Sequence, residues 1–120
     1  MFQRRIVAKK LFRAYNNTVD DEIDLRKNIM NELFQKVGKD VWIEPDFRCE
    51  FGKNIIIEDN VYINFGCVIL DCAEVVIGDN TIIGTGSVVT KDIPANVIAV
   101  GNPCKVLRAI TEADKTDYLK

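Results

Sequence analysis

Aliphatic residues return at every sixth position through the middle of the chain, between Val37 and Pro94. The repeat runs in three registers, and each change of register is a slip of two residues, which an inserted corner or loop would produce. The aliphatic series are Val37, Ile43, Cys49 and Ile55; Ile57, Ile63, Ile69 and Val75; and Ile77, Ile83 and Val89. Small polar residues that favour turns lie between these positions, as in Gly78-Asp79-Asn80.

A period of six matches neither the helical period of about 3.6 nor the simple alternation of an amphipathic strand. It is typical of a hexapeptide β-helix, in which flat strands alternate with tight corners and the aliphatic side chains stack in columns. The alternative is a β-sandwich with evenly spaced strands, but sandwich strands recur at intervals of roughly 8–12 residues. The tighter spacing favours a β-helix over residues 37–104.

Two amphipathic helices are expected in the segment before the repeat, residues 1–36. The first spans Arg4 to Tyr15, and its apolar stripe is Ile6, Val7, Leu11, Ala14 and Tyr15. Asp20 or Asp21 can cap a second helix that closes at Gly38. The apolar residues of this second helix are Ile23, Ile29, Met30, Leu33 and Phe34. With a turn at residues 16–18, the two helices form a hairpin that covers one end of the coil.

The repeat ends where Pro94 and the sequence Gly101-Asn102-Pro103 interrupt it. Residues 105–120 form a C-terminal arm, either a short helix or an extended segment, in which Ile110 and Tyr118 are free to pack. The sequence therefore predicts a mainly β protein: a short parallel β-helix with an N-terminal helical hairpin and a C-terminal arm.

Composition and charge exclude several classes of partner. The net charge is −2 at pH 7, so the chain lacks the basic excess that is typical of nucleic-acid-binding proteins. It also lacks a polybasic run that would bind an anionic membrane. The longest apolar stretches, such as residues 97–100, are far too short to span a bilayer. The N-terminus is basic but lacks the apolar core of a signal peptide, so we expect a cytoplasmic protein.

The four cysteines, Cys49, Cys67, Cys72 and Cys104, form no CxxC pair. We expect reduced thiols, several of them at core positions. Metal ligation by the four is the alternative, but their irregular spacing and the absence of histidine disfavour it, and no metal is expected.

Four segments of the chain resemble the maltose and galactoside O-acetyltransferases. They are residues 41–45 (VWIEP), 60–65 (NVYINF), 88–94 (VVTKDIP) and 100–106 (VGNPCKV). The lead-in from Arg5 to Phe34 and the tail at residues 110–115 (ITEADK) are similar as well. The resemblance implies a left-handed coil, a homotrimer, acetyl-CoA as co-substrate and a sugar as acceptor.

The similarity is interrupted between Asn80 and Thr81. Family members carry a long segment there, with several coils, a protruding loop and the catalytic histidine. In this chain residues 77–80 (IGDN) run straight into residues 81–84 (TIIG), as though two similar corners had been joined. The resemblance further predicts that this chain starts later than its relatives, which have a further N-terminal helical stretch. An internal deletion of this kind is tolerable in a solenoid because it removes a few interfaces between coils.

Acetyl transfer to a hydroxyl needs a base that titrates near neutrality, and histidine is the usual choice. The chain contains no histidine, so the family's base is missing and no catalytic residue is assigned. Glu50 or Asp71 could deprotonate a hydroxyl in principle, but an ordinary carboxylate is a weak base.

The resemblance assigns four residues to substrate binding. Tyr62 and Asn64 match positions that line the acceptor and catalytic pocket. Asp71 lies near the family's acidic acceptor-contacting position, and Glu50 stands where relatives carry a short polar or acidic group. The alternative for Tyr62 is an aromatic side chain packed between subunits, and the alternative for Asn64 is an asparagine that caps a corner. For Asp71 and Glu50 the alternative is a solvated carboxylate at a corner.

Five residues match the family's coenzyme A site: Thr85, Thr90, Lys91, Lys105 and Arg108. Thr85 matches a corner whose backbone approaches the pantetheine arm, and the other four match positions that hold the nucleotide and phosphates. Cations suit a ligand with a pyrophosphate and a 3′-phosphate. The alternative is ordinary surface charge.

Two hypotheses about function follow. The first is an acetyl-CoA-dependent O-acetyltransferase that acts on a sugar hydroxyl. The second is a catalytically inactive remnant, a trimeric β-helix scaffold with residual coenzyme A binding. A zinc carbonic anhydrase on the same fold is excluded, because that site uses three histidines and the chain has 0.

Overall fold

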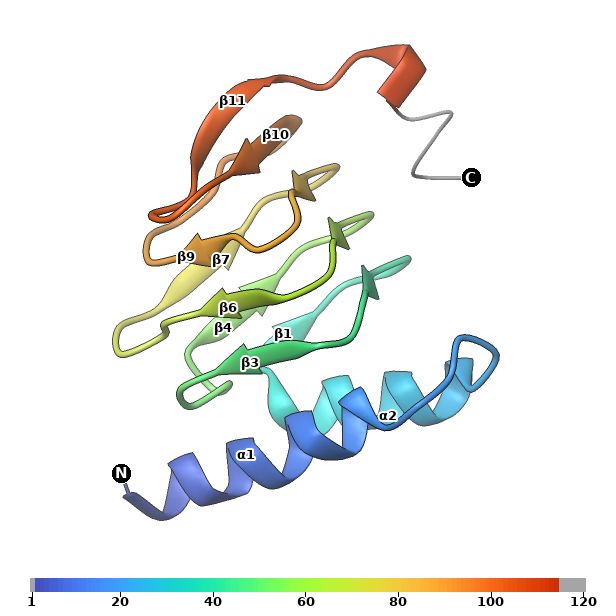
Figure 1. The fold of residues 1–120 in the computed structure, drawn as a ribbon, viewed down its shortest axis with the longest axis vertical. Helices are drawn as coiled ribbons and strands as arrows, with labels where there is room; N and C mark the ends of the chain where they lie inside the picture. The colour runs from blue at the N-terminus through green and yellow to red at the C-terminus, as the bar shows by residue number, and fades with distance from the viewer. Residues whose placement is uncertain (1, 115–120) are drawn as a thin grey trace.

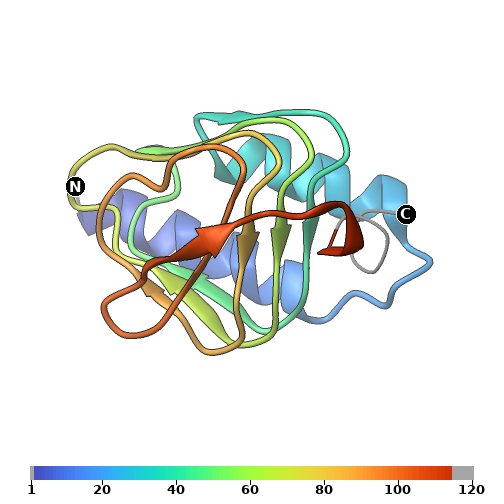
Figure 2. The same cartoon turned by 90° about the horizontal axis from the view of Figure 1, so that it is seen from above.

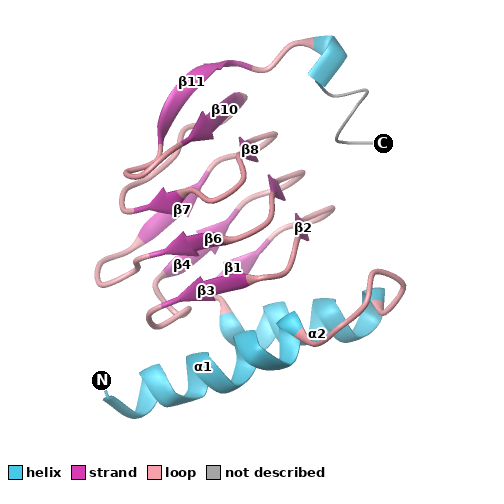
Figure 3. Cartoon of the chain, viewed as in Figure 1, coloured by secondary structure: helices cyan, strands magenta, loops and turns pink. Residues whose placement is uncertain are grey.

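The computed structural model describes residues 2–114 as a parallel β-helix that stands on two helices (Figure 1). The helices are α1 (Phe2–Asn16) and α2 (Ile23–Leu33). The strands are β1 (Lys36–Val37), β2 (Trp42–Ile43), β3 (Phe47–Cys49), β4 (Ile55–Ile57), β5 (Tyr62–Ile63), β6 (Cys67–Ile69), β7 (Val75–Ile77), β8 (Ile82–Ile83), β9 (Val88–Val89), β10 (Val97–Val100) and β11 (Lys105–Ala109). Figure 3 shows the helices gathered at one end and the strands stacked above them.

The strands form three sheets, with the orders β1-β4-β7, β11-β10-β8-β5-β2 and β3-β6-β9. Pairing is parallel except between β10 and β11. Each strand pairs with the strand one coil further on, as in Val37 with Ile57 and Ile57 with Ile77. Figure 2, seen from above, shows successive coils lying over one another. The β-helix is confirmed, and a two-layer sandwich is wrong.

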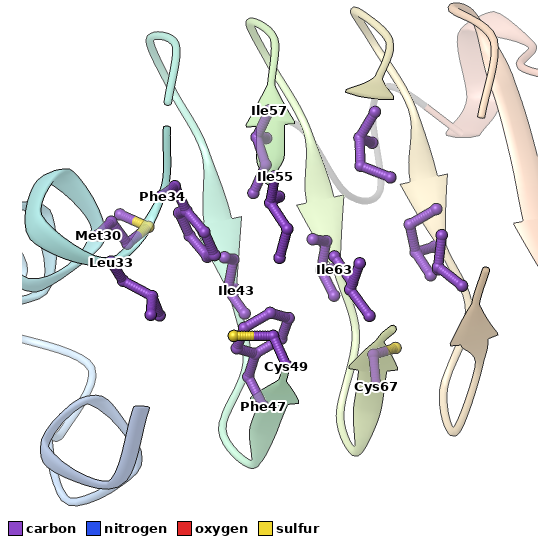
Figure 4. Packing of buried hydrophobic residues seen from close by; sticks show 14 of the residues in the cluster. Met30, Leu33, Phe34, Ile43, Phe47, Cys49, Ile55, Ile57, Ile63 and Cys67 are labelled. Atoms are coloured by element: carbon purple, nitrogen blue, oxygen red, sulfur yellow. The ribbon is translucent and has the colours of Figure 1, made fainter. Parts of the chain in front are cut away.

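The predicted aliphatic columns form the core (Figure 4). Ile57, Ile63 and Ile69 are 0%, 1% and 0% exposed, and Ile77, Ile83 and Val89 lie above them at 0% exposure. These branched side chains point inward from flat strands and can be covered only by neighbouring coils, so burial depends on stacking. Leu33 and Phe34 cover the end of the column beside the helices.

The strands meet at three corners of the coil. The first corner comprises residues 38–40, 58–60, 78–80 and 94–96; the second comprises 44–46, 64–66 and 84–86; and the third comprises 50–54, 70–74 and 90–92. The longer turns 50–54 and 70–74 contain the two-residue slips in the repeat. Corner residues at the same place in the first two full coils are therefore 20 positions apart.

Stacking continues without a break across Asn80 and Thr81, where the resemblance indicates a deletion. Tyr62 pairs with Ile82 and Ile63 with Ile83, in the register of the coil below. At the first corner the Asn60 amide donates to Asn80 and the Asn80 amide donates to Asn96, at 2.8 and 2.9 Å. The last step of this ladder spans 16 residues. The junction therefore keeps every aliphatic residue in phase with its column.

The helices differ from prediction in their buried faces. In α1 the buried residues are Ala8, Phe12 and Tyr15, whereas Ile6 and Val7 are 42% and 41% exposed. Spacings of four and three residues place Ala8, Phe12 and Tyr15 on one side of the helix. The predicted stripe through Ile6, Val7 and Ala14 is wrong, because the bulky Phe12 and Tyr15 rings decide which side packs.

The second helix begins and ends at other residues than predicted. Its N-cap residue is Glu22, with no capping side-chain bond, while Asp20 forms an ion pair with Arg26 at 3.2 Å. The helix stops at Leu33, five residues before Gly38, because the backbone from Gln35 onward already bonds to β4. Pairing with the coil thus overrides the glycine stop signal.

At the other end, β11 forms an antiparallel pair with β10, where an arm was expected. Ile110 is half-buried, and its backbone N–H donates to Asn96, whereas Tyr118 lies outside the described residues. The four cysteines are free, with Cys49 and Cys67 buried. Within residues 2–114 there is no helix long and apolar enough to cross a membrane, and no group of three potential metal ligands.

Tyr15 joins α1 to the coil and makes stability depend on pH. Its hydroxyl donates to the Ile43 carbonyl at 2.6 Å, and burial raises the pKa of Tyr15 to about 12 from 10.0. The unfolded phenol ionises first, so this contribution is intact below pH 10 and is lost as the pH rises through 12. We expect a loss of about 2.7 kcal/mol in the free energy of unfolding.

Urea titrations between pH 8 and 12 measure this loss. The Tyr15→Phe variant is less stable at pH 8, because it lacks the hydrogen bond to Ile43, but its stability falls less at high pH. Parallel curves for the two proteins would contradict the assignment to Tyr15.

Candidate functional site

Two of the four predicted substrate residues, Glu50 and Asp71, meet at the third corner. One carboxylate oxygen of Asp71 accepts the backbone N–H groups of Glu50 and Phe51, each at 3.0 Å. Asp71 is 0% exposed, and its Oδ2 atom has no hydrogen-bond partner among the described residues. A solvated corner carboxylate is therefore wrong for Asp71. These two bonds join Asp71 to the coil below and hold the longer turn 50–54 in place. The backbone N–H groups of the turn need such a partner because they are not paired with another strand.

Glu50 is engaged by a residue of the first helix. Its carboxylate lies 2.9 Å from the Arg5 guanidinium, which also lies 5.1 Å from the centre of the Phe51 ring. The exposed Cys72 thiol donates to the same carboxylate at 3.2 Å, and this bond raises the pKa of Cys72. Neither Glu50 nor Asp71 thus stands as a free base beside an open surface.

The other two substrate residues, Tyr62 and Asn64, lie beside the second corner and away from the third. The Asn64 side chain accepts the backbone N–H of Phe65 at 2.8 Å, which is the corner-capping alternative. The Tyr62 hydroxyl donates to one oxygen of Glu44 at 3.1 Å, and the indole N–H of Trp42 donates to the other at 3.0 Å. One carboxylate therefore fixes two aromatic rings on adjacent coils.

The sequence did not predict this aromatic pair or the arginine beside it. Trp42 pairs with Tyr62 in the sheet, so both rings project from the same face. The guanidinium of Arg26, 4% exposed, lies 5.4 Å from the Trp42 ring centre and 5.6 Å from that of Tyr15. Arg26 also donates to the Thr18 hydroxyl at 2.7 Å. Parallel pairing of positions 20 apart was the signal that could have revealed the two rings.

A groove of about 1010 Å³ lies between α2 and this face of the coil. Trp42 and Tyr62 line it from the sheet, and the first corner and one side of α2 supply the remaining walls. Its lining residues are Ile23, Lys27, Met30, Asn31, Val37, Gly38, Lys39, Asp40, Val41, Trp42, Asn60, Val61 and Tyr62. Of the predicted substrate residues, Tyr62 alone lines this groove.

The five predicted coenzyme residues are distributed over the last coil. Thr85 belongs to the second corner, whereas Lys105 belongs to β11, which β10 separates from β8 in the sheet. Thr90 and Lys91 are exposed at the third corner, across β9. Arg108 pairs with Ile98 in the sheet, toward the first corner. One chain therefore does not gather all five around one point.

Arg108 is held by an acidic neighbour. Two of its nitrogens lie 2.7 and 2.9 Å from the Asp114 carboxylate. These bonds hold the pKa of Asp114 well below its usual range. The bidentate pair competes with any phosphate for the same guanidinium, whereas no such pair is seen for Lys91 or Lys105 within residues 2–114.

Comparison with known proteins gives one consistent group. The family model for the "Maltose acetyltransferase hexapeptide capping motif" matches residues 1–38. Galactoside O-acetyltransferase of Escherichia coli K12 is 30% identical, over 98% of this chain and 85% of the relative. That alignment extends over 172 residues although this chain has 120, so the difference is a gap within this chain.

Two solved structures are similar to the fold. A galactoside acetyltransferase in complex with coenzyme A has a TM-score of 0.61 and 29% identity, covering 94% of this chain and 84% of that one. A maltose O-acetyltransferase from Clostridium difficile 630 has a TM-score of 0.51 and 32% identity, covering 92% of this chain and 88% of that one.

Proposed function

This chain belongs to the family of maltose and galactoside O-acetyltransferases, and from that premise we propose that it binds coenzyme A on a β-helical scaffold without transferring acetyl groups by itself. The observation that carries the proposal is the absence of histidine from the whole chain. The pairing of Glu50 with Arg5 and the burial of Asp71 support it, because neither carboxylate is free to replace the missing base.

Coenzyme A binding is the part of the family function that the remaining residues favour. The similar galactoside acetyltransferase was solved with coenzyme A. Thr85 at the second corner, Lys105 at the start of β11, and Thr90 and Lys91 at the third corner are all exposed. A phosphate-rich ligand gains charge-assisted hydrogen bonds from such lysines. Coenzyme A is here a substrate or a bound ligand, and no resident cofactor is proposed.

A homotrimer is part of the same proposal. Apolar side chains remain exposed on the coil, including Phe65 at 53% and Leu70 at 39%, and association with other copies would cover them. The coenzyme residues lie at separate corners of one chain, and a trimer brings corners of different chains together. Because acetyl-CoA is used inside cells, we place the protein in the cytoplasm.

The second candidate function is complete acetyl transfer from acetyl-CoA to a sugar hydroxyl. It is favoured by the 30% identity to the galactoside O-acetyltransferase of Escherichia coli K12 along nearly the whole chain. It requires a base from outside the family's pattern, with Glu50 as the accessible candidate once Arg5 moves aside.

Calorimetry with coenzyme A tests the binding proposal. We expect a dissociation constant on the order of micromolar, and a loss of about tenfold in Lys91→Ala and in Lys105→Ala, since each removes a phosphate contact worth about 1.4 kcal/mol. Arg108→Ala is expected to change affinity by about twofold at most, because Asp114 already holds that guanidinium.

Lys9→Ala is the matched control, an exposed lysine on α1 at the opposite end of the coil. Absence of heat at millimolar coenzyme A would end the proposal. An equal loss in Lys9→Ala and Lys91→Ala would show a general charge effect instead of a site.

A further inference from the structure

We propose that the outer face of α1 binds the surface of an anionic lipid membrane, with the helix lying flat among the headgroups. This outer face consists of five exposed side chains of the helix: Phe2, Ile6, Lys9, Lys10 and Arg13. The proposal goes beyond the proposed function, because it requires neither coenzyme A nor catalysis.

The first argument is the segregation of charge. The helix carries five of the 16 basic residues of the chain and none of its 18 acidic residues. Arg4 donates to two backbone carbonyl groups, and Arg5 forms an ion pair with Glu50, so these two are already engaged. No ion pair is seen within residues 2–114 for the three cations of the outer face. Their charge is therefore available to an anionic partner.

The second argument is the position of the face. The helix lies at one end of the coil, and its buried residues pack on the molecule (Figure 1). Spacings of three and four residues join Phe2 to Ile6, and Ile6 to Lys9 and Lys10, along another side of the helix. The outer face is thus one continuous strip, about 20 Å long. Apolar residues separate its cations in the sequence, so no polybasic run is visible until the helix gathers them.

The third argument is the mixture of apolar and basic side chains. Phe2 and Ile6 are 75% and 42% exposed, in the same strip as the cations. Helices that lie in a membrane interface bury such apolar side chains at the boundary of headgroups and acyl chains. Their lysine and arginine side chains meanwhile contact anionic lipid. Water covers Phe2 and Ile6 in the isolated chain, and a lipid surface would remove them from it.

The distribution of acidic residues fixes the orientation. Every acidic residue of the helical hairpin follows α1, in the turn or in α2: Asp20, Asp21, Glu22, Asp24 and Glu32. Because like charges repel, the hairpin can approach an anionic surface closely only through α1. We therefore expect the coil to point away from the membrane, with its last strands farthest from the lipid.

The same strip disfavours other anionic partners. The phosphates of a nucleic acid would attract the cations, but they offer no apolar contact to Phe2 and Ile6. A lipid surface supplies phosphate groups and hydrocarbon side by side, so it satisfies both kinds of side chain.

Flotation with lipid vesicles tests the proposal. We expect binding to vesicles that mix phosphatidylglycerol with phosphatidylcholine, weakening as salt rises, and none to phosphatidylcholine alone. The double variant Lys10→Gln, Arg13→Gln is expected to bind about 25-fold more weakly, since each cation near an anionic surface contributes about fivefold. The matched control is Lys27→Gln, Lys39→Gln, which removes two exposed charges from α2 and the first corner and should bind as the wild type does. All four side chains are exposed, so neither variant should lose the fold.

Phe2→Ser separates the apolar contribution from the charge. It is expected to weaken binding to the anionic vesicles while leaving the salt dependence as in the wild-type protein, because no charge is removed.

Several outcomes would overturn the proposal. One is the absence of wild-type protein on the anionic vesicles, and another is equal binding to neutral vesicles, which would show simple adsorption of apolar side chains. A third is an equal loss in the two double variants. A fourth is binding of a DNA or RNA oligonucleotide through the same cations without vesicle binding. Calorimetry with coenzyme A is done without lipid, so failure of the proposed function leaves this proposal standing, and the reverse holds as well.

Discussion

Replacing Gly78 by alanine is expected to lower the free energy of unfolding by about 3 kcal/mol. A Cβ atom at this position would lie 2.5 Å from the backbone nitrogen of Ala95 and 2.8 Å from its Cα. Both are main-chain atoms of the next coil, which cannot rotate away as a side chain can. Gly78 also donates its N–H to Ile93 at 2.9 Å, so the corner cannot shift without loosening the last coil. Urea denaturation of the wild-type protein and the variant measures the difference.

Gly66→Ala is the control for this prediction. Gly66 has a φ of +70°, but a Cβ there would meet nothing within 4 Å. Its replacement therefore costs the backbone strain of the left-handed region, about 1 kcal/mol, without a steric clash. Equal losses in the two variants would contradict the close approach of residues 94–96 to residues 78–80. A neutral Gly78→Ala would mean that the last, shorter coil does not stack there.

The coil could be predicted from the sequence because each of its determinants is local. Six-residue spacing places Ile63, Ile69 and the other column residues, and positive φ angles at Asn60 and Asn80 are what asparagine tolerates at tight corners. The register across Asn80 and Thr81 followed the same spacing. Whether the junction kept whole coils was not visible in the sequence, since it depends on the 20-residue and 16-residue steps seen in the structure.

The candidate site was predicted less well because its geometry depends on tertiary contacts. Nothing near Asp71 in the sequence shows that its carboxylate is buried against the backbone of Glu50 and Phe51, one coil earlier. The groove is lined by both α2 and the strands that carry Trp42 and Tyr62, and helix placement is not encoded in the repeat. The resemblance assigned the site residues one position at a time, and in the structure these residues lie near three different corners of the coil.

Acetyl transfer by this chain is expected to be about 100- to 10,000-fold slower, in kcat/KM, than that of the galactoside O-acetyltransferase of Escherichia coli K12. This is the range that a positioned general base contributes, and the chain has no histidine to supply one. Glu50 forms an ion pair with Arg5, and Asp71 is buried, so neither carboxylate can replace the missing base. The measurement is chromatographic detection of acetylated maltose or galactoside, with both proteins assayed in parallel.

Product detection is preferable to a thiol reagent because the exposed Cys72 would react with such a reagent and mimic released coenzyme A.

Two variants decide which group acts if turnover is found. Loss of turnover in Glu50→Gln with a gain in Arg5→Gln would identify Glu50 as the base, because the first change removes the carboxylate and the second frees it from its ion pair. Turnover near that of the relative, unchanged in both variants, would contradict the proposal that this chain binds coenzyme A without catalysis. A rate at the uncatalysed level, together with calorimetric binding of coenzyme A, would separate the two halves of the family's function in a single protein.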